Sequence, residues 1–138
     1  MVDIAQAIKK VFDGTPALQG FFGYLTTISG DPPDDQPRPF CILRLGDEEI
    51  VTEAFRARIV RRSVSFLCAT TKLEALADAT QAIDEVFDDR EPARIVLGDG
   101  CTMIYMGRVS ADAEDMEEIA HGRTLNYQIT YQVPRTRR

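Results

Sequence analysis

Near its C-terminal end the chain contains a ten-residue stretch, from Thr124 to Val133, that alternates strictly between apolar and polar side chains. One parity holds only apolar and aromatic residues, namely Leu125, Tyr127, Ile129, Tyr131 and Val133. Successive side chains of a β-strand point to opposite faces of its sheet, so this stretch predicts a strand with one buried and one polar face. Pro134 is expected to end the strand. The polar face either meets solvent or packs against a second copy of the chain.

Two other segments have the spacing of amphipathic helices. Between Val2 and Asp13 the apolar residues recur three and four positions apart, which predicts a helix that Gly14 ends. Over residues 72–87 the same spacing predicts the longest helix of the chain. A capping box, with Thr71 as N-cap and Glu74 three positions later, is expected to open this helix.

Strand-like apolar runs fill much of the remaining chain. They lie at Tyr24–Ile28, Phe40–Leu45, Arg58–Ala69, Arg94–Leu97 and Cys101–Val109. The last run is apolar on both faces, which predicts a central strand. Thr15-Pro16 predicts the start of a short helix over residues 18–21. Connections are expected at Ser29–Pro37, at Gly98–Gly100 and, strongly acidic, at Ser110–Gly122.

The order of these elements predicts an α+β fold. We expect a mostly antiparallel sheet of about four to five strands, with the long helix and the N-terminal helix packed on it. With 138 residues, the chain is expected to form a single domain over 1–138, in which 135–138 is a basic tail.

Charge and hydropathy exclude several classes of protein. Sixteen basic against 22 acidic side chains give a net charge of −6, which disfavours a freestanding nucleic-acid-binding protein. No apolar run approaches the roughly 18 residues that a membrane span requires. The N-terminus has charged residues where a signal peptide would be apolar. We therefore expect a soluble protein that is made in the cytoplasm and has no membrane partner.

The sequence has no motif for catalysis or cofactor binding. It lacks the G-x-G-x-x-G, Walker and G-x-S-x-G patterns. Its single histidine, His121, has no second histidine with which to bind a metal, and is expected to be an exposed loop residue. Cys41, Cys68 and Cys101 lack metal-ligand spacing and are expected to be small buried hydrophobic residues. No catalytic residue, metal or cofactor is predicted.

Charged residues are segregated along the chain. Acidic residues gather in three segments, 31–35, 47–49 and 112–118, while arginines gather at 56–62 and at 135–138. The third acidic segment lacks the central glycine of a calcium-binding loop. Two interpretations stay open. A basic strand of one subunit docks on an acidic loop of the next, or the arginines are ordinary surface charge that protects an edge strand from aggregation.

Several short stretches, taken in order, resemble a known family. They are the helix D-I-A-Q-A-I-K-K-V-F, the short helix T-P-A-L-Q-G-F, the strand start P-R-P-F-C-I-L, the basic strand R-R-S-V-S-F-L-C-A-T-T, the helix K-L-E-A-L-A-D-A-T-Q-A-I-D-E-V-F and the last strand L-N-Y-Q-I-T-Y-Q-V. Across nearly the whole chain, this order is similar to that of the tail terminator (tail completion) proteins of long-tailed bacteriophages, which also occur in prophages and gene transfer agents.

The resemblance implies a structural role. Members of this family form a hexameric ring on the head-proximal end of the tail tube, end its polymerisation and join the tail to the head connector. The implied partners are other copies of the chain, the tail-tube protein and the connector or adaptor proteins, with DNA passing through the lumen without specific binding. The implied location is the virion, with the host cytoplasm during assembly. No catalysis and no cofactor are involved.

Charge segregation within such a ring predicts its contacts. We expect the subunit interface to use Arg56, Arg58, Arg61 and Arg62 on one copy and Asp112, Glu114, Asp115, Glu117 and Glu118 on the next. Contacts with the tube or connector are expected at Asp34, Asp35, Arg135, Arg137 and Arg138.

Two alternatives stay open at this stage. Within virion assembly, the chain is instead a head-completion or connector adaptor protein, or a tail-tube subunit. Outside virion assembly, it is a small α+β dimer that binds a ligand or acts as an enzyme, which would require a concave pocket with convergent polar groups.

Overall fold

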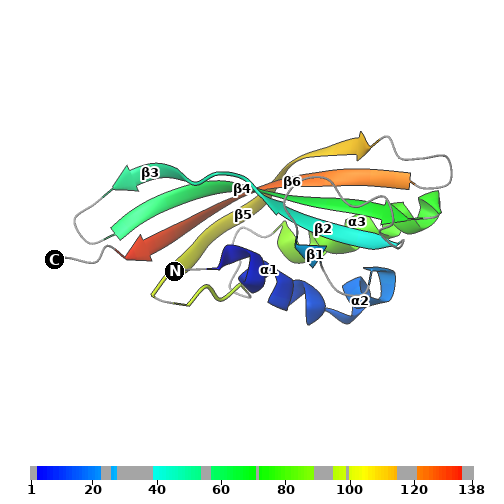
Figure 1. The fold of residues 1–138 in the computed structure, drawn as a ribbon, viewed down its shortest axis with the longest axis horizontal. Coiled ribbons are helices and arrows are strands. Elements are labelled where there is room, and N and C mark those ends of the chain that lie inside the picture. The colour runs from blue at the N-terminus through cyan, green and yellow to red at the C-terminus, as the bar shows by residue number, and fades with distance from the viewer. Residues whose placement is uncertain are drawn as a thin grey trace.

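A computed structural model describes residues 3–22, 26–27, 39–53, 57–70, 72–88, 95–98, 100–114 and 121–134. The helices are α1 (Ile4–Asp13), α2 (Pro16–Phe22) and α3 (Leu73–Phe87). The strands are β1 (Thr26–Thr27), β2 (Phe40–Leu45), β3 (Glu49–Glu53), β4 (Ala57–Thr70), β5 (Thr102–Glu114) and β6 (His121–Pro134). Figure 1 shows one twisted sheet with the helices gathered along one side of it.

The sheet is built around its two longest strands. β4 and β6 pair antiparallel along their whole length, from Ala57 opposite Pro134 to Thr70 opposite His121. The strand order is β1-β2-β4-β6-β5, and β3 pairs with β4 in addition. All pairs are antiparallel except β1 with β2. The predicted α+β class, with a mostly antiparallel sheet and packed helices, is confirmed.

β2 and β3 share one side of β4. β2 pairs with the C-terminal half of β4, from Ala69 to Val64, and β3 pairs with its N-terminal half, from Arg61 to Arg58. The bounds predicted for the strand at Phe40–Leu45 match β2. β3 was not predicted. In Figure 1, β3 and the adjacent ends of β4 and β6 extend beyond the helices along the long axis of the molecule.

The core lies between the helices and one face of the sheet, which we call the covered face. Residues Leu125 to Tyr131 of β6 contribute every second side chain to it, as the alternation predicted. Aromatic rings fill its centre: the ring centroid of Phe66 on β4 lies 4.9 Å from that of Phe87 and 6.3 Å from that of Phe12. Because a fully buried side chain of this size contributes roughly 1.5–3 kcal/mol, these contacts hold α1 and α3 on the sheet.

The two N-terminal helices follow the sequence signals closely. The Asp3 carboxylate accepts a hydrogen bond of 3.0 Å from the Gln6 amide and caps α1. α1 ends at Asp13, and Gly14 follows it with φ −83°, so this glycine does not need left-handed backbone. α2 starts at Pro16 as expected. The Thr15 hydroxyl, expected to cap this helix, instead donates a hydrogen bond of 2.8 Å to the Val11 carbonyl of α1.

The start of α3 corrects one prediction. Its N-cap is Lys72, without a side-chain capping bond, so the capping box expected at Thr71 does not open the helix where predicted. The reason is a local contact of the preceding strand: the Thr70 hydroxyl donates 2.7 Å to the Lys72 carbonyl. Thr71 itself lies outside the described residues. The predicted apolar face of the helix is confirmed, with buried residues Leu76, Ala79, Thr80, Ile83 and Phe87.

The last two strands are longer than predicted. β5 continues to Glu114 and β6 starts at His121, so both ends of the predicted connection Ser110–Gly122 belong to paired strands and His121 is a strand residue. Backbone pairing with β6 outweighs the low β-propensity of the acidic residues. The prediction of a central position is also wrong, because β5 is the edge strand of the sheet. Its apolar residues divide between the core and solvent: Met103 and Met106 are buried, whereas Ile104 and Val109 are exposed.

The prediction of a strand at Arg94–Leu97 is wrong for residues 95–97, the part of it that the structure describes. Residues 95–97 have no strand pairing, although Ile95 and Leu97 are buried in the core. The predicted turn after them is confirmed, since the Cys101 amide donates 2.9 Å to the Gly98 carbonyl. Gly98 and Gly100 both have φ +76°, a left-handed conformation that glycine adopts without strain.

Two cysteines meet in the core. Cys41 of β2 and Cys68 of β4 are directly opposite in register, fully buried, with 3.7 Å between their sulfur atoms. The buried position predicted for them is confirmed, whereas Cys101 is only partly buried. The expected exposed loop at Ser29–Pro37 lies outside the described residues. Among the helices described, none has the length and apolarity needed to cross a membrane.

Candidate interaction surface

The arginines of β4 bind the acidic residues of β3. Strand alternation places Arg58 on the covered-face side of β4 and Arg61 on the opposite side. Arg58 contacts Glu53 at 2.8 Å, and Arg61 contacts Glu49 with two nitrogens, at 2.8 and 3.3 Å. These pairs attach β3 to β4 on both faces of the sheet. All four side chains are about 40% exposed or more, so each pair contributes only about 0–1 kcal/mol.

Arg62 contacts the connection between β2 and β3 at Gly46 and Glu48. Its Nε donates a hydrogen bond of 2.6 Å to the Gly46 carbonyl, and its Nη1 lies 3.9 Å from the Glu48 carboxylate. The Tyr131 hydroxyl donates 2.9 Å to the same carboxylate. Burial, and then this contact with Glu48, raises the pKa of Tyr131 to about 12. A Cβ at position 46 would collide with the Ser63 hydroxyl oxygen, so any larger residue there requires the Ser63 side chain to rotate away.

The structure keeps the predicted basic and acidic patches apart within one chain. Through β6, Arg61 is in register with Tyr105 of β5, whereas Asp112 is in register with Leu67 of β4. Six residues of β4 separate the two positions, which is about 20 Å. Of the other predicted interface residues, Glu114 lies at the end of β5. Outside the described residues lie Arg56, Asp115, Glu117, Glu118, Asp34, Asp35, Arg135, Arg137 and Arg138.

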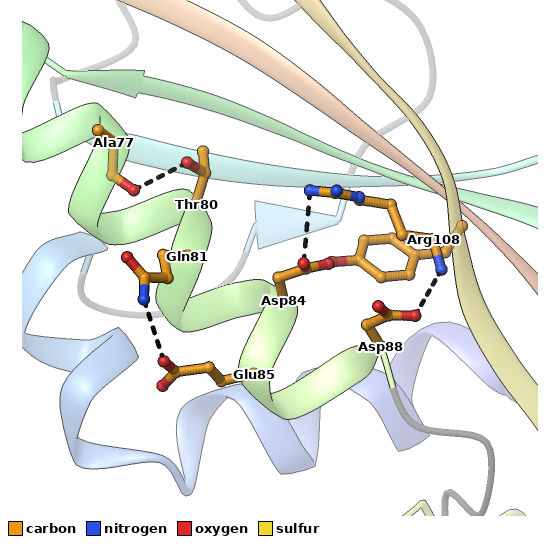
Figure 2. Close-up of polar contacts among 8 residues, drawn as sticks. Ala77, Thr80, Gln81, Asp84, Glu85, Asp88 and Arg108 are labelled. Carbon is orange, nitrogen blue, oxygen red and sulfur yellow. Dashed lines mark hydrogen bonds and ion pairs between the residues drawn. The ribbon is translucent and has the colours of Figure 1, made fainter.

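A partly buried polar cluster joins α3 to β5 and β6 and was not predicted. The Tyr127 hydroxyl donates a hydrogen bond of 2.8 Å to Asp84 Oδ1, and Arg108 Nη1 lies 3.4 Å from Asp84 Oδ2. The Arg108 amide donates 3.0 Å to Asp88 (Figure 2). Burial, followed by the bond to Asp84, raises the pKa of Tyr127. The signal was present in the sequence, because a tyrosine on the buried parity of a strand requires a partner for its hydroxyl.

Polar side chains form a ladder on the face of the sheet opposite the covered face. This opposite face also holds a second, smaller apolar cluster of Phe40, Ile42, Leu67 and Ala69. The Ser65 hydroxyl donates a hydrogen bond of 2.7 Å to Asn126 Oδ1. Asn126 Nδ2 in turn donates a hydrogen bond of 3.0 Å to the Ser110 hydroxyl. These bonds connect β4, β6 and β5. The polar parity predicted for the last strand therefore has bonding partners within the sheet.

The described residues offer little for ligand chemistry. They contain no group of three or more His, Cys, Asp or Glu side chains that could hold a metal ion. A groove of about 410 Å³ lies between α1 and Val96, lined by Ala7, Lys10, Val11, Gly14, Thr15 and Val96. Two polar side chains, those of Lys10 and Thr15, line this groove, and the Thr15 hydroxyl is bonded to the Val11 carbonyl. Convergent polar groups, which a ligand site requires, do not line this groove.

Exposed aliphatic side chains occur on both edges of the sheet. Ile50 and Val51 lie on β3, and Ile104 and Val109 lie on β5. Sequence reasoning missed these positions, because the apolar run of β5 was interpreted as a buried central strand. In Figure 1, β3 and β5 lie on opposite sides of the sheet.

A search of solved structures finds a chain with a similar fold. It has the fold of a protein chain in the virion of a native gene transfer agent particle, with a TM-score of 0.63. The likeness covers 94% of this chain and 98% of that chain, at 13% sequence identity. No protein-family model matches the sequence, and neither does any curated protein. At this identity the likeness establishes the fold, and the two chains share it almost end to end.

Proposed function

We propose that the protein is a structural component of a phage-like virion, and specifically the tail terminator. In this role it forms a ring, of six copies by the family resemblance, that caps the head-proximal end of the tail tube. The ring ends tube polymerisation and joins the tail to the head connector. The observation that carries the proposal is the fold shared with the gene transfer agent virion chain over 94% of this chain and 98% of the other.

The near-complete coverage of both chains matters for this argument. A fold shared over only part of each chain would fit many roles, whereas here the likeness spans 94% of this chain and 98% of the other. The element order that resembles tail terminators points to the same kind of particle independently. The proposed role requires surfaces for protein contacts rather than a catalytic site.

The two edges of the sheet suit a ring. One edge includes β3 and the other is β5, and the two strands differ in sequence. Contact between unlike surfaces is heterologous and closes into a ring when the rotation between neighbours permits. The proposed basic side of the interface includes Arg58 and Arg61, each of which has unused donors because a guanidinium has five N–H groups.

The remaining contacts belong to the same proposal. The acidic side of the interface is Asp112, Glu114, Asp115, Glu117 and Glu118 of the next copy, and Arg56 adds to the basic side. Asp34, Asp35 and the basic residues at 135–138 contact the tube or the connector. DNA passes through the lumen of the ring without specific binding.

Electron microscopy and native mass spectrometry test the proposal. We expect negative-stain images of the protein, mixed with the tail-tube protein of its particle, to show single rings at one end of tubes. Native mass spectra should show a closed oligomer, alone or on the tube. Long polymers of the protein by itself would identify a tube subunit instead. A strict monomer under both conditions would contradict the ring.

A further inference from the structure

Two thiols of the core face each other across a pair of strands. Cys41 of β2 and Cys68 of β4 are directly opposite in register, and both belong to the core of the covered face. Their sulfur atoms are 3.7 Å apart, and both residues are completely buried. The sequence has three cysteines in 138 residues, so two of the three occupy a single cross-strand pair.

The backbone geometry of this pair suits a disulfide bond. Residues directly opposite each other in an antiparallel pair have Cα atoms about 4.5 or 5.5 Å apart, and disulfide-bonded cysteines have Cα atoms about 4.4–6.8 Å apart. The register therefore already holds the two backbones within bonding range. To form the bond, the sulfur atoms have to approach from 3.7 Å to about 2.0 Å, which needs side-chain rotation and a small approach of the two strands.

The pair lies at a junction of the sheet. The strand order is β1-β2-β4-β6-β5, and among the described strands only the pairing of β2 with β4 joins β1 and β2 to the others. Phe40 and Ile42, the neighbours of Cys41 in the chain, are buried in the apolar cluster of the opposite face. Opening of β2 would therefore expose apolar groups on both faces, and a covalent bond from Cys41 to Cys68 would prevent that opening.

From these observations we propose that Cys41 and Cys68 form a redox-sensitive lock, which is open as two thiols in a reducing compartment and closes to a disulfide in oxidising surroundings. The occasion for closure rests on the proposed function, because a virion is assembled in a reducing cytoplasm and then enters an oxidising medium. The closed lock ties β2 to β4 in the released particle.

Closure is a two-step exchange with a low-molecular-weight disulfide, such as oxidised glutathione. The thiolate of one cysteine attacks a sulfur of the small disulfide, which breaks the S–S bond, forms a mixed disulfide and releases one small thiolate. The thiolate of the other cysteine then attacks the protein sulfur of the mixed disulfide and releases the second small thiolate. The two cysteines lose two electrons, the small disulfide gains them, and the two cysteine protons end on the two released thiols.

Burial makes this exchange slow in both directions. It raises the pKa of Cys41, and only a thiolate attacks a disulfide. In the closed sheet both thiols are also out of reach of solvent, so exchange has to await opening of the β2–β4 pairing. The bond, once formed, is protected from reductants in the same way. The state of the lock therefore follows long exposure to an environment and does not respond to a brief one.

Refolding in defined glutathione buffers tests the lock on the full chain. Cys101→Ser is unfolded in urea and refolded with an excess of either oxidised or reduced glutathione. We expect the oxidised sample to be lighter by two hydrogen atoms and to yield a peptide that links Cys41 to Cys68. For cysteines 27 positions apart, the folding equilibrium constant from urea denaturation should be larger in the linked protein on the order of a hundredfold. The cysteine-free Cys41→Ala/Cys68→Ala/Cys101→Ser is the control and should have the same unfolding curve in both buffers.

Three results would overturn the lock. They are two free thiols after refolding with oxidised glutathione, a mixed disulfide with glutathione that persists, and a linked protein no more stable than the reduced one. If the cysteine-free control does not fold, the comparison of the two states of Cys101→Ser decides. In particles collected outside the cell we expect the linkage, and in protein alkylated inside the cell we expect two thiols. Free thiols in the released particles would overturn closure on release.

The capping of tubes by the reduced protein tests the proposed function separately. A protein that forms the stabilising linkage but never caps tubes would support the lock and overturn the terminator proposal. Rings that cap tubes, made of a protein that never forms the linkage, would overturn the lock and leave the terminator proposal standing.

Discussion

Two buried tyrosines connect the stability of the protein to pH. The hydroxyls of Tyr127 and Tyr131 donate to Asp84 and Glu48. Burial is the main reason that both pKa values are raised, that of Tyr131 to about 12 from an ordinary 10.0. A raised folded-state pKa means that the folded protein retains the proton after the unfolded chain has released it. The stabilisation is complete below pH 10.0 and is lost as pH rises through the folded-state pKa.

We expect the free energy of unfolding to fall steadily between about pH 10 and pH 12, and to fall less steeply in Tyr127→Phe/Tyr131→Phe. Near neutral pH, Tyr127→Phe alone should cost about 1–2 kcal/mol, because the partly buried Asp84 loses a donor. Urea denaturation across this pH range measures both effects. Tyr105→Phe, at an exposed site, is the control and should change stability by less than about 0.5 kcal/mol. A double variant with the wild-type pH slope would contradict the assignment.

The facing cysteines should be chemically inert in the folded protein. Burial is the main cause that raises the pKa of Cys41, and the thiolate is the reactive form. We expect one thiol, that of the partly buried Cys101, to react readily with a disulfide reagent under native conditions. In Cys101→Ser, labelling should occur only at the rate of unfolding. Rapid native labelling of Cys41 or Cys68 would show that β2 opens locally.

At the scale of the elements, β3 is held on β4 by backbone pairing and by two charged pairs rather than by apolar burial. All five of its residues are exposed, so apolar burial contributes little to its position. The contacts that attach it to β4 are Glu49 with Arg61 and Glu53 with Arg58. Its pairing should therefore open more readily than the pairing of β4 with β6.

A charge exchange tests this dependence. Arg61→Glu places two acidic side chains opposite each other and should cost about 0.5–1 kcal/mol, while Arg61→Glu/Glu49→Arg should recover most of that loss. Hydrogen exchange of the β3 amides reports the local effect, and urea denaturation reports the global one. Failure of the exchange to restore protection would mean that Arg61 does not hold β3 in place. Lys9→Glu, which disrupts a pair on α1, should leave β3 protection unchanged.

Element prediction from the sequence succeeded where one physical rule dominated. Helical spacing placed α1 and the buried face of α3, and strict alternation placed the buried side chains of β6. The rule failed at β5, where an apolar run on both faces was interpreted as burial on both faces. Two bulges explain the discrepancy, because they direct Ile104 and Val109 into solvent. Bulges depend on register, which sequence periodicity does not reveal.

The candidate interaction surface was predictable only in part. The cluster of arginines was apparent from the sequence, and Arg58, Arg61 and Arg62 lie on β4, with Arg58 and Arg61 on opposite faces of the sheet. Their in-chain partners were not apparent, because no local signal marked residues 49–53 as a strand. The Tyr127–Asp84 bond joins residues 43 positions apart, and only the packing of α3 on the sheet brings them together.

At the scale of the whole molecule, the charge distribution carries more information than the net charge of −6. The arginines of β4 and the acids at the end of β5 lie at opposite ends of the long strands. Within one copy, the described members of the two groups, such as Arg61 and Asp112, lie too far apart to touch. Contact between such groups on neighbouring copies is part of the ring proposed above. The α+β class itself followed from element order, because few layer arrangements accommodate such a succession of helices and strands.

The full-length pairing of β4 with β6 has a mechanical consequence. Fourteen residue pairs join the two strands in an unbroken register, over a span of about 45 Å. Tension applied along the strands would load these hydrogen bonds in shear and simultaneously, whereas tension across them would open the pairs one after another. The molecule is therefore expected to be stiff along its long axis and compliant across it. A subunit oriented with that axis along the direction of pull would transmit force between its neighbours with little extension.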